Sequence, residues 1–423
     1  MTKLSTRLDA LRPKIEELMR IGRTPGLSLG VMHQGDQTYL ASYGYRDVEQ
    51  GLPPNDETIL PVCSLTKAVI SAALGILVDE NKANWNTLVK DALPSLDIKD
   101  ETLQNQMTIA DLLCHRGKVS MAFLNRQTRL LPFRGQFAYN NLAYEIAGKV
   151  IESLSKESYS DFIQSRIFDP LGMTRTYLKT TPPDLDNVGK CYNALDDGTS
   201  VPIACVKHGD DWFGGPSGGM RTCVRELMKL YKAFVKGFNH EFSSGHTSTE
   251  GMPLKQVAQL MSAKIPMDQP SKYEASHGFG WARVQLPGRM GQIGINPGLM
   301  PDGMPIVGKG VAPRAVIFHQ GTSERNDYLA AAKTSAATNL QWYPDLVTDL
   351  QQARKNGTSG RVFHTYAGTY WDSPHVIKIV VTAENDHIYW AFQGLESEKF
   401  RLTHYEDDTF IWLRTSYHGV ADG

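Results

Sequence analysis

The sequence predicts an α+β fold, mainly because of where strand patterns fall along the chain. Apolar residues alternate over Leu27–Val31, Gln34-Gly35-Asp36 supplies turn chemistry, and Gln37–Gly44 predicts the returning strand. Strand patterns return at Phe279–Gln285 and Ala315–His319, and the segments between these two groups have helical spacing. Antiparallel strands at both ends with helices between them are typical of α+β proteins rather than of alternating β-α-β folds.

The helices are predicted from apolar residues that recur every three or four positions. Leu4 to Leu18 follow this spacing and predict one amphipathic helix near the N-terminus. Ser64–Glu80 is apolar almost all round, which indicates a buried helix. Further helices are predicted over Thr108–Cys114, Asn141–Leu154, Tyr159–Ile167 and Arg225–Phe234.

The residues from Val362 onward predict a small β module. β-branched and aromatic residues dominate there, and Asn385-Asp386 and Asp407-Asp408 separate them as hairpin turns. The preceding stretch Lys355–Gly360 has the composition of a linker. We therefore expect a larger unit over residues 1–354, a linker over 355–361 and a β-rich module over 362–423.

Composition and charge limit the partners of this protein. Hydrophobic residues make up 41% of the 423 residues and charged residues 21%, which allows a large core and excludes global disorder. With 44 Lys and Arg against 45 Asp and Glu, the net charge of −1 lacks the positive surplus that nucleic acids require. No apolar run reaches the roughly 18 residues of a membrane span. We therefore expect neither a nucleic-acid partner nor a membrane partner.

The cysteines and the N-terminus favour a reducing compartment. The 5 cysteines contain no C-x-x-C pair, so they indicate neither a zinc ribbon nor a disulfide scaffold. The 12 histidines are scattered rather than spaced as metal ligands. The first residues form an amphipathic pattern and contain no apolar signal core. We therefore expect a cytoplasmic protein.

The strongest candidate for chemistry is Ser64-x-x-Lys67, at the start of the predicted buried helix. Because three residues make nearly one helical turn, the hydroxyl and the amine lie on one face. Serine needs a base to become a nucleophile, and burial lowers the pKa of a lysine toward that task. The helix N-terminus also offers N–H groups to an oxyanion. A single such motif is most often a surface pair, and Ser153-x-x-Lys156, in a polar stretch, fits that description.

A second candidate, Tyr139-x-Asn141, stands at the start of the predicted helix Asn141–Leu154. A phenol held near a lysine can be pushed toward phenolate and can then move protons between nucleophile and leaving group. Asn141 could hydrogen-bond the Lys67 amine or a substrate carbonyl. The alternative is a turn tyrosine followed by an asparagine that caps the helix.

A third candidate, His319-Gln-Gly321-Thr322, comes directly after the apolar run Ala315–Phe318, which predicts a strand. Glycine at a strand end lets a substrate approach the backbone, and the N–H of Thr322 could donate to an oxyanion. Two other H-x-G triplets begin at His33 and His115, so the triplet alone is weak. Only the copy at 319 follows a strand and comes third in chain order. The alternative is that His319 packs in the core or makes a structural hydrogen bond.

In this order the three motifs resemble the serine β-lactamase and penicillin-binding-protein superfamily, whose signature is S-x-x-K, Y-x-N and then K-T-G or H-x-G. The spacing resembles the class C β-lactamase and family VIII esterase branch, and simvastatin-synthase-like acyltransferases are similar in layout. Smaller family-like blocks are Pro170–Met173, Ser217–Met220 and His277–Trp281. The resemblance covers about Leu4 to Thr322, and the β tail resembles a lipocalin-like extension. It implies a β-lactamase-like antiparallel sheet flanked by helices, with an all-helical region.

The resemblance also implies a role for each motif. Ser64 is the expected acylated nucleophile, Lys67 its general base or proton relay, and Tyr139 the second acid/base. Asn141 is expected to orient Lys67 and the substrate. No metal or organic cofactor is implied. The residues expected to form the oxyanion hole and to line the strand side of the site are Ser64, His319, Gly321 and Thr322.

Two departures from the family pattern predict a smaller cap over the site and a shorter central sheet. Only 21 residues separate Cys114–Gly117 from Tyr139, so part of the cap over the site is expected to be missing. After Thr322, the Ala-rich run Leu329–Thr338 replaces the expected apolar strands, so the central sheet is expected to be shorter. Lys333-Thr-Ser335 is a rival third motif, but its surroundings indicate a helix.

The leading hypothesis is a cytoplasmic serine hydrolase that works through an acyl-enzyme on an ester, lactone, amide or thioester of secondary metabolism. Acyl transfer to an alcohol is an alternative, because only the nucleophile that resolves the acyl-enzyme differs. An isomerase or cyclase that uses Lys67 and Tyr139 for proton transfer is another alternative. A binding protein with a catalytically dead pocket is the last. The oligomeric state is not predicted.

Overall fold

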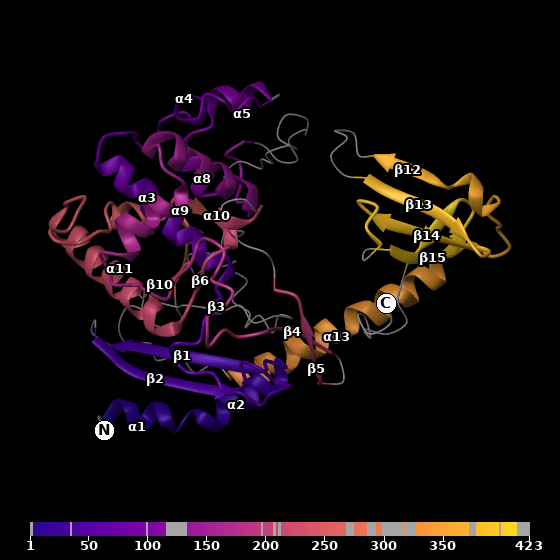
Figure 1. The fold of residues 1–423 in the computed structure, drawn as a ribbon, viewed down its shortest axis with the longest axis horizontal. Coiled ribbons are helices and arrows are strands. Elements are labelled where there is room, and N and C mark those ends of the chain that lie inside the picture. The colour runs from indigo at the N-terminus through magenta and orange to yellow at the C-terminus, as the bar shows by residue number, and fades with distance from the viewer. Residues whose placement is uncertain are drawn as a thin grey trace. The chain divides into compact units, whose positions relative to one another are not determined.

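The computed structural model describes residues 3–33, 36–98, 100–115, 133–195, 198–205, 209, 213–267, 275–285, 293–297, 317–318, 327–371, 378–396 and 399–412. The chain forms two compact units (Figure 1). The first comprises Met1–Ala194 and Ser200–Ala332, and the second comprises Leu195–Thr199 and Lys333–Gly423. The first unit combines helices with antiparallel strands, so the predicted α+β class is confirmed.

The first unit begins with two short helices, α1 (Lys3–Asp9) and α2 (Arg12–Ile21), where the periodicity predicted one. Pro13 lies in the first turn of α2. Because proline has no N–H, it is accepted at the start of a helix but not in its interior, so the chain starts a second helix there. The strands β1 (Gly26–His33) and β2 (Asp36–Gly44) then pair antiparallel, as predicted.

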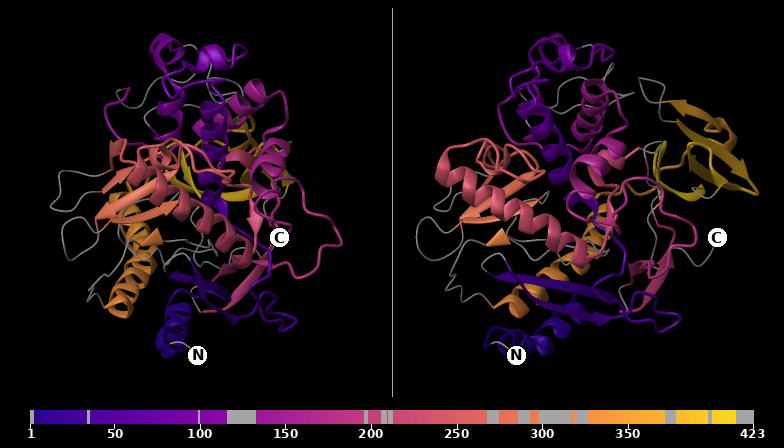
Figure 2. Two further views of the ribbon diagram at one scale, coloured as in Figure 1. Left: turned by 90° about the vertical axis from the view of Figure 1, so that its left-hand side faces the viewer. Right: turned by 60° about the vertical axis from the view of Figure 1, so that its left-hand side comes forward.

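The predicted buried helix is α3 (Thr66–Asp79), which follows the short 3₁₀ turn η1 (Cys63–Leu65). Every residue from Thr66 to Leu77 is buried, because α8 (Asn141–Ser155) and α10 (Gly215–Gly218) pack against it. The long helix α11 packs against β1 (Figure 2). The other described helical elements of this unit are α4 (Val89–Ala92), α5 (Glu101–Gln106), α6 (Ile109–Leu113), α9 (Tyr159–Ile163), η2 (Gln164–Phe168), α11 (Val224–Ser244) and α12 (Val257–Met261).

A five-stranded antiparallel sheet runs in the order β11-β10-β9-β8-β7. The fully buried Trp281 of this sheet packs edge-on against Phe234 of α11, with ring centroids 4.7 Å apart. The strands predicted around residues 279–285 and 315–319 are found as β9 and β11. The strands of the sheet are β7 (Ile265–Pro266), β8 (Ala275–His277), β9 (Trp281–Gln285), β10 (Ile293–Pro297) and β11 (Ile317–Phe318).

The first unit also contains two smaller strand pairs, of which one joins distant segments and the other is a hairpin. The strand β3 (Leu60–Pro61) pairs with β6 (Arg221–Thr222), which brings the chain ahead of η1 beside the chain that follows α10. The strand β4 (Cys191–Ala194) pairs with β5 (Ser200–Ile203). The first pair therefore ties together the two segments that frame Ser64.

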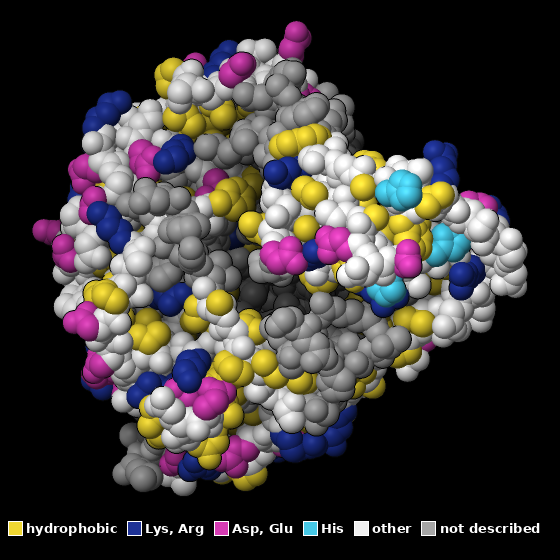
Figure 3. All heavy atoms as spheres, turned by 45° about the vertical axis from the view of Figure 1, so that its right-hand side comes forward, with side chains coloured by type: hydrophobic (Ala, Val, Ile, Leu, Met, Phe, Trp, Pro, Cys, Tyr) yellow, Lys and Arg dark blue, Asp and Glu magenta, His cyan; other side chains and the backbone are white. Residues whose placement is uncertain are grey.

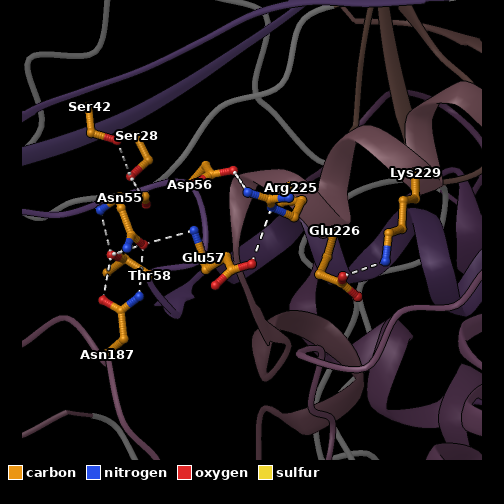
Figure 4. A network of polar contacts seen from close by, with 10 residues as sticks. All are labelled: Ser28, Ser42, Asn55, Asp56, Glu57, Thr58, Asn187, Arg225, Glu226 and Lys229. Carbon is orange, nitrogen blue, oxygen red and sulfur yellow. Dashed lines mark hydrogen bonds and ion pairs between the residues drawn. The ribbon is translucent and has the colours of Figure 1, made fainter.

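A polar network fixes the segment that leads into β3 (Figure 4). The main-chain carbonyl of Asn55 accepts a hydrogen bond from Ser28 Oγ of β1 at 3.0 Å, and Asn55 Oδ1 accepts one from Asn187 Nδ2 at 2.8 Å. Arg225, at the start of α11, forms an ion pair with Asp56 at 2.5 Å. Because separate parts of the chain hold this segment, the path of the backbone toward Ser64 is well defined.

A disulfide joins Cys191 and Cys205, with their Cα atoms 5.5 Å apart, although the cysteine pattern predicted none. Cys191 pairs with Ile203 in the β4–β5 hairpin, so the hairpin places Cys205 next to it. A separation of 14 residues carries no C-x-x-C signal, and only the strand pairing reveals the contact. Cys63, Cys114 and Cys223 are not part of a disulfide.

The second unit contains most of α13 (Tyr328–Ala353) and a five-stranded antiparallel sheet. The hairpin turn between β13 and β14 is the predicted one, with φ angles of 49° at Asn385 and 59° at Asp386. Tyr405 Oη donates to the carbonyl oxygen of Leu350 at 2.6 Å, which anchors the end of α13. The remaining elements are η3 (Phe363–Thr365), β12 (Gly368–Trp371), β13 (Lys378–Glu384), β14 (His387–Phe392), β15 (Lys399–Glu406) and β16 (Thr409–Ile411).

The sheet of the second unit buries few large side chains completely. Ile388 is 1% exposed, whereas Tyr370 is 51% and Trp412 is 55% exposed. Hydrophobic side chains are visible among charged and histidine side chains on the surface of this unit (Figure 3). The described part of this unit therefore has a small core.

Candidate active site

Ser64 and Lys67 lie together at the start of the buried helix. Ser64 belongs to the turn η1, and Lys67 lies in the first turn of α3. Lys67 Nζ is 3.0 Å from Ser64 Oγ, so the prediction that this spacing places both groups on one face is confirmed. Cys63, directly before the serine, has a φ of 47°. Such left-handed backbone is uncommon for cysteine and is typical of positions that present a functional side chain.

The Lys67 ammonium group is fully buried, and burial controls its protonation. Burial lowers its pKa from 10.5 to about 7, and the negative charge of Glu145 partly opposes this effect. A lysine with this pKa is about half neutral near pH 7 and can accept a proton. The ammonium group donates to Ser64 Oγ at 3.0 Å, to Asn141 Oδ1 at 2.7 Å and to the Ser217 carbonyl oxygen at 2.6 Å.

Tyr139 completes the group around the serine hydroxyl. Its Oη lies 2.5 Å from Ser64 Oγ, and Lys67 Nζ lies 4.9 Å from its ring centre. Burial raises the pKa of Tyr139, and its hydrogen bond with Ser64 only partly offsets this effect. Burial therefore favours the phenol form of Tyr139, and the suggested shift toward phenolate stays a prediction. Of the two residues, Lys67 is the one suited to act as base, and Tyr139 can donate a proton.

Asn141 is the first residue of α8, and its side chain points to Lys67 rather than capping the helix. The cap is its neighbour Asn140, whose Oδ1 accepts a hydrogen bond from the Leu142 N–H at 3.0 Å. Because Asn140 satisfies the helix end, the Asn141 amide can hold the Lys67 ammonium group. The capping alternative therefore applies to Asn140, and the predicted contact of Asn141 with Lys67 is present.

Two buried residues at the site, Ser217 and Glu145, were not among the predicted site residues. The Ser217 carbonyl oxygen accepts the 2.6 Å hydrogen bond from Lys67. The Glu145 carboxylate accepts hydrogen bonds from the N–H groups of Gly214 and Ser217, each at 3.2 Å. A carboxylate inside an otherwise apolar helical run, four residues after Asn141, was the signal in the sequence that pointed to Glu145.

Two buried histidines pack near Tyr139: His115 lies next to its ring, and His277 lies next to His115. The His115 ring centre lies 4.6 Å from that of Tyr139, and its Nδ1 accepts a hydrogen bond from the Asn140 N–H at 3.0 Å. The His277 ring centre lies 4.9 Å from that of His115, and its Nδ1 donates to the Gly278 carbonyl oxygen at 2.7 Å. Burial lowers the pKa of both, that of His277 to about 4. Both rings are therefore neutral at pH 7. His115, the first residue of an H-x-G triplet that was not chosen as a site motif, thus lies next to Tyr139.

The third predicted motif is not placed by the structure. His319, Gly321 and Thr322 lie outside the described residues, which reach only the strand β11 ahead of them. The expected second donor of the oxyanion hole is therefore a prediction from the sequence. The Ser64 N–H lies at the N-terminal end of the α3 segment, as expected.

The two competing motifs each lie in a helix. The S-x-x-K copy at Ser153 lies at the end of α8, where Lys156 is exposed and terminates the helix with a φ of 66°. Lys333–Ser335 lies within α13, as its surroundings predicted. Among the described residues, no group of three or more His, Cys, Asp or Glu side chains is arranged to hold a metal ion.

In this chain a buried lysine at the start of a helix contacts the hydroxyl of a serine three residues before it. This arrangement is typical of proteins with an S-x-x-K serine site. The beta-lactamase family model matches residues 11–341, and the chain belongs to this family, whose members are generally serine hydrolases. Residues 352–421 match a second model, described as a domain of unknown function, DUF3471.

Similar proteins agree with the family. Protein flp from Staphylococcus aureus (strain N315) is 26% identical over 237 residues, which cover 52% of this chain and 47% of that protein. Unguisins hydrolase ungD' from Aspergillus campestris (strain IBT 28561) is 31% identical over 179 residues, which cover 36% of this chain and 33% of that protein. The matches thus span about half the length of these relatives or less.

Two solved structures share the fold. The octameric penicillin-binding protein homologue from Pyrococcus abyssi has a TM-score of 0.55 at 22% identity, over 93% of this chain and 90% of that one. The class C beta lactamase from Rhodobacter sphaeroides has a TM-score of 0.57 at 16% identity, over 79% of this chain and 99% of that one. The predicted β-lactamase-like fold with a small C-terminal sheet is therefore confirmed.

Proposed function

We propose that this protein is a serine hydrolase that cleaves an ester, lactone, amide or thioester bond of a small molecule through an acyl-enzyme on Ser64. Membership of the beta-lactamase family and the contacts of Ser64 with Lys67 and Tyr139 support this proposal. The relative from Aspergillus campestris is an unguisins hydrolase, which supports hydrolysis and a substrate from secondary metabolism.

The observation that carries the proposal is the set of atoms around Lys67 Nζ. Charged Lys67 uses its three hydrogens on Ser64 Oγ, Asn141 Oδ1 and the Ser217 carbonyl oxygen. The last two atoms accept hydrogen bonds and have no hydrogen to give. When Lys67 is neutral, its two hydrogens stay on these acceptors, and its lone pair faces the Ser64 hydroxyl. The site thus directs the base at the nucleophile.

The proposed reaction follows from these contacts. Lys67 takes the hydroxyl proton as Ser64 Oγ attacks the substrate carbonyl carbon, and a tetrahedral oxyanion forms. The bond from that carbon to the leaving group breaks, and Tyr139 supplies the proton that the leaving group needs, while Lys67 returns one to Tyr139. Water then attacks the acyl carbon and gives a proton to the same pair. The bond from that carbon to Ser64 Oγ breaks, the pair returns the proton to Ser64 Oγ, and the acid leaves. Acyl transfer differs only in that an alcohol replaces this water.

Covalent labelling of the serine tests the proposal. Incubation with a fluorophosphonate, followed by intact-protein mass spectrometry, is expected to show one adduct that Ser64→Ala abolishes. Ser153→Ala, in the second S-x-x-K, serves as the matched control and is expected to label normally. Turnover of p-nitrophenyl acetate is expected to follow the same pattern, and an added alcohol acceptor reports on acyl transfer.

The other outcomes of this experiment favour the competing functions. Turnover that survives in Ser64→Ala contradicts the acyl-enzyme and favours proton transfer by Lys67 and Tyr139, as in an isomerase or cyclase. Native protein that forms no adduct and turns over no ester, lactone or amide contradicts the proposal and favours a binding protein.

The cytoplasmic location belongs to the same proposal and has its own test. No helix among the described residues is long and apolar enough to cross a membrane. The disulfide between Cys191 and Cys205 opposes the location, since disulfides are rare in reducing compartments. Cell fractionation with thiol labelling is expected to find the protein in the cytosol, and recovery of an exported protein contradicts the proposed location.

A further inference from the structure

Glu145 is a buried carboxylate that the proposed reaction does not use. It lies on α8, four residues after Asn141 and therefore on the same face of the helix. Only 7% of the residue is exposed, and its neighbours Tyr144 and Ile146 are fully buried. Burying a carboxylate costs free energy unless hydrogen bonds and charge compensate for the loss of water. The position of Glu145 therefore needs an explanation.

Both oxygens of Glu145 bind a turn of the backbone. Oε2 accepts a hydrogen bond from the Gly214 N–H and Oε1 from the Ser217 N–H, each at 3.2 Å. The turn is closed from within by Ser217 Oγ, which donates to the Gly214 carbonyl oxygen at 3.2 Å. Gly214 has a φ of 98°, a conformation that favours glycine. The two ends of residues 214–217 are thus fastened to one carboxylate.

The same turn carries an acceptor of the Lys67 ammonium group. Ser217, whose N–H binds Glu145, also supplies the carbonyl oxygen that lies 2.6 Å from Lys67 Nζ. A displacement of this turn therefore changes the direction in which Lys67 holds its lone pair. Asn141, the other acceptor, is fixed independently by the start of α8.

We propose that Glu145 is a positioning residue of this site, which holds the 214–217 turn so that the Ser217 carbonyl oxygen orients Lys67 toward Ser64. This inference rests on the proposed function, because it assigns a task that matters only if Lys67 serves as the base. Glu145 acts through Ser217 and does not touch the reacting atoms.

The charge of Glu145 gives the proposal a signature in the pH profile. Its negative charge opposes the lowering of the Lys67 pKa by burial. Loss of that charge lowers the pKa of Lys67 further, so the neutral base persists to lower pH. The titratable groups that act on Lys67 or lie against it are Cys63, His115, Tyr139, Tyr144, Glu145 and His277.

Near neutral pH the groups other than Glu145 are uncharged. Burial raises the pKa of Cys63, Tyr139 and Tyr144, which keeps them protonated, and lowers that of both histidines, which keeps them neutral. Burial also raises the pKa of Glu145, while its hydrogen bonds with Ser217 and Gly214 and the Lys67 charge act in the opposite direction. A change in the acid limb of the profile after Glu145→Gln therefore reports on this pair.

The test compares native protein with Glu145→Gln, Glu145→Asp and Glu241→Gln. Glutamine removes the charge and puts an NH₂ group against a backbone N–H, so kcat/KM for p-nitrophenyl acetate is expected to fall about 10- to 100-fold. The acid limb is expected to move to lower pH. Glu145→Asp keeps the charge but shortens the reach, so kcat falls while the limb stays near its native position.

Glu241 is a matched control on α11. It is also buried, at 2% exposure, and accepts a backbone hydrogen bond, from the Ala258 N–H at 2.9 Å. Glu241→Gln keeps an acceptor for the Ala258 N–H and is expected to leave the acid limb in its native position. An acid limb that is unchanged in Glu145→Gln, or that moves equally in Glu241→Gln, overturns the proposal.

A second measurement separates this inference from the proposed function. The pKa of Lys67, followed by NMR of ¹⁵N-labelled lysine side chains, needs no substrate and is expected to be lower in Glu145→Gln. If Ser64→Ala retains turnover, the acyl-enzyme has failed, whatever this pKa shows. If Ser64 is labelled normally but the pKa of Lys67 does not change, the role of Glu145 alone is overturned.

Discussion

Lys67 is the residue on which the proposed chemistry of this site depends, because burial gives it a pKa of about 7, at which it can both hold and release a proton. Three oxygen atoms surround its amine, and one of them belongs to the nucleophile. Tyr139 has the opposite property, since burial keeps its hydroxyl protonated. The pair thus provides one base and one acid within reach of the same serine oxygen.

At the residue scale we predict that activity rises with pH through about 7, because Lys67 with a pKa of about 7 must be neutral to act as base.

Lys67→Ala and Tyr139→Phe are each expected to lower kcat by about 10²–10⁴-fold. Steady-state kinetics with p-nitrophenyl acetate across pH measures both effects. Lys156→Ala is the control and is expected to leave kcat unchanged. A native profile that falls with pH through 7 would contradict the assignment of Lys67 as base.

The helix α8 is the element that assembles the site. Asn141, Glu145 and Gly148 succeed one another along one face of it. Asn141 contacts Lys67, Glu145 binds the N–H groups of Gly214 and Ser217, and Gly148 lies against Pro216 of the same turn. The sequence predicted this helix and its start, because apolar spacing and a capping residue are local signals. It did not predict α10, whose Gly-Pro-Ser-Gly sequence has no helical periodicity.

At the element scale we predict that Gly148→Ala damages the site through packing. A Cβ there would lie 2.5 Å from Pro216 Cγ, so α10 must move away from α8 and carry the Ser217 carbonyl oxygen with it. Overpacking of this kind costs about 1–3 kcal/mol, and kcat is expected to fall with the displacement. Urea unfolding and ester kinetics measure the two effects.

Gly237→Ala is the matched control for this change. A Cβ at Gly237 would lie 2.9 Å from Val257 Cγ2, so it also overpacks a contact between helices, α11 and α12. It is expected to lower stability while kcat is retained. If Gly148→Ala leaves both stability and kcat at native values, the close contact between α8 and α10 does not matter for the site.

At the scale of the whole molecule, buried ionisable groups make stability depend on pH. The pKa of His277 falls from 6.5 in the unfolded chain to about 4 in the folded protein, so folding excludes a proton from it. The contribution of neutral His277 to the free energy of unfolding is complete above pH 6.5. It is lost as the pH falls toward 4, because the unfolded chain then binds a proton that the folded protein excludes. Glu241 acts in the opposite sense, because burial raises its pKa from 4.5 to about 7. The net profile is the sum of such effects.

A single variant isolates the contribution of His277. His277→Asn keeps a donor for the Gly278 carbonyl oxygen but has no group that titrates in this range. The stability difference between native protein and variant is expected to shrink by about 2 to 3 kcal/mol between pH 7 and pH 4.5. Free energies of unfolding from urea titrations measure it, with the exposed His246→Asn as control. A difference that stays constant with pH would contradict the neutral, buried state of His277.

The sequence by itself determined those features that depend on neighbours in the chain. The pairing of Ser64 with Lys67 follows from the helical repeat, the start of α8 from a capping signal, and the Asn385-Asp386 hairpin from turn chemistry. The order of the motifs also predicted the family. In each case the physical reason is local geometry, which the chain carries wherever the segment is placed.

Only the tertiary structure decided which distant groups meet. Tyr139 reaches Ser64 across 75 residues, Ser217 reaches Lys67 across 150, and Cys191 meets Cys205 through a hairpin. The contacts of Glu145 with the 214–217 turn and of His115 with Tyr139 likewise join separate segments. Burial itself, which lowers the pKa of Lys67 and raises that of Tyr139, is a property of the assembled core. The spacing of residues in one segment carries no record of these contacts, because they form only when separate segments exclude water together.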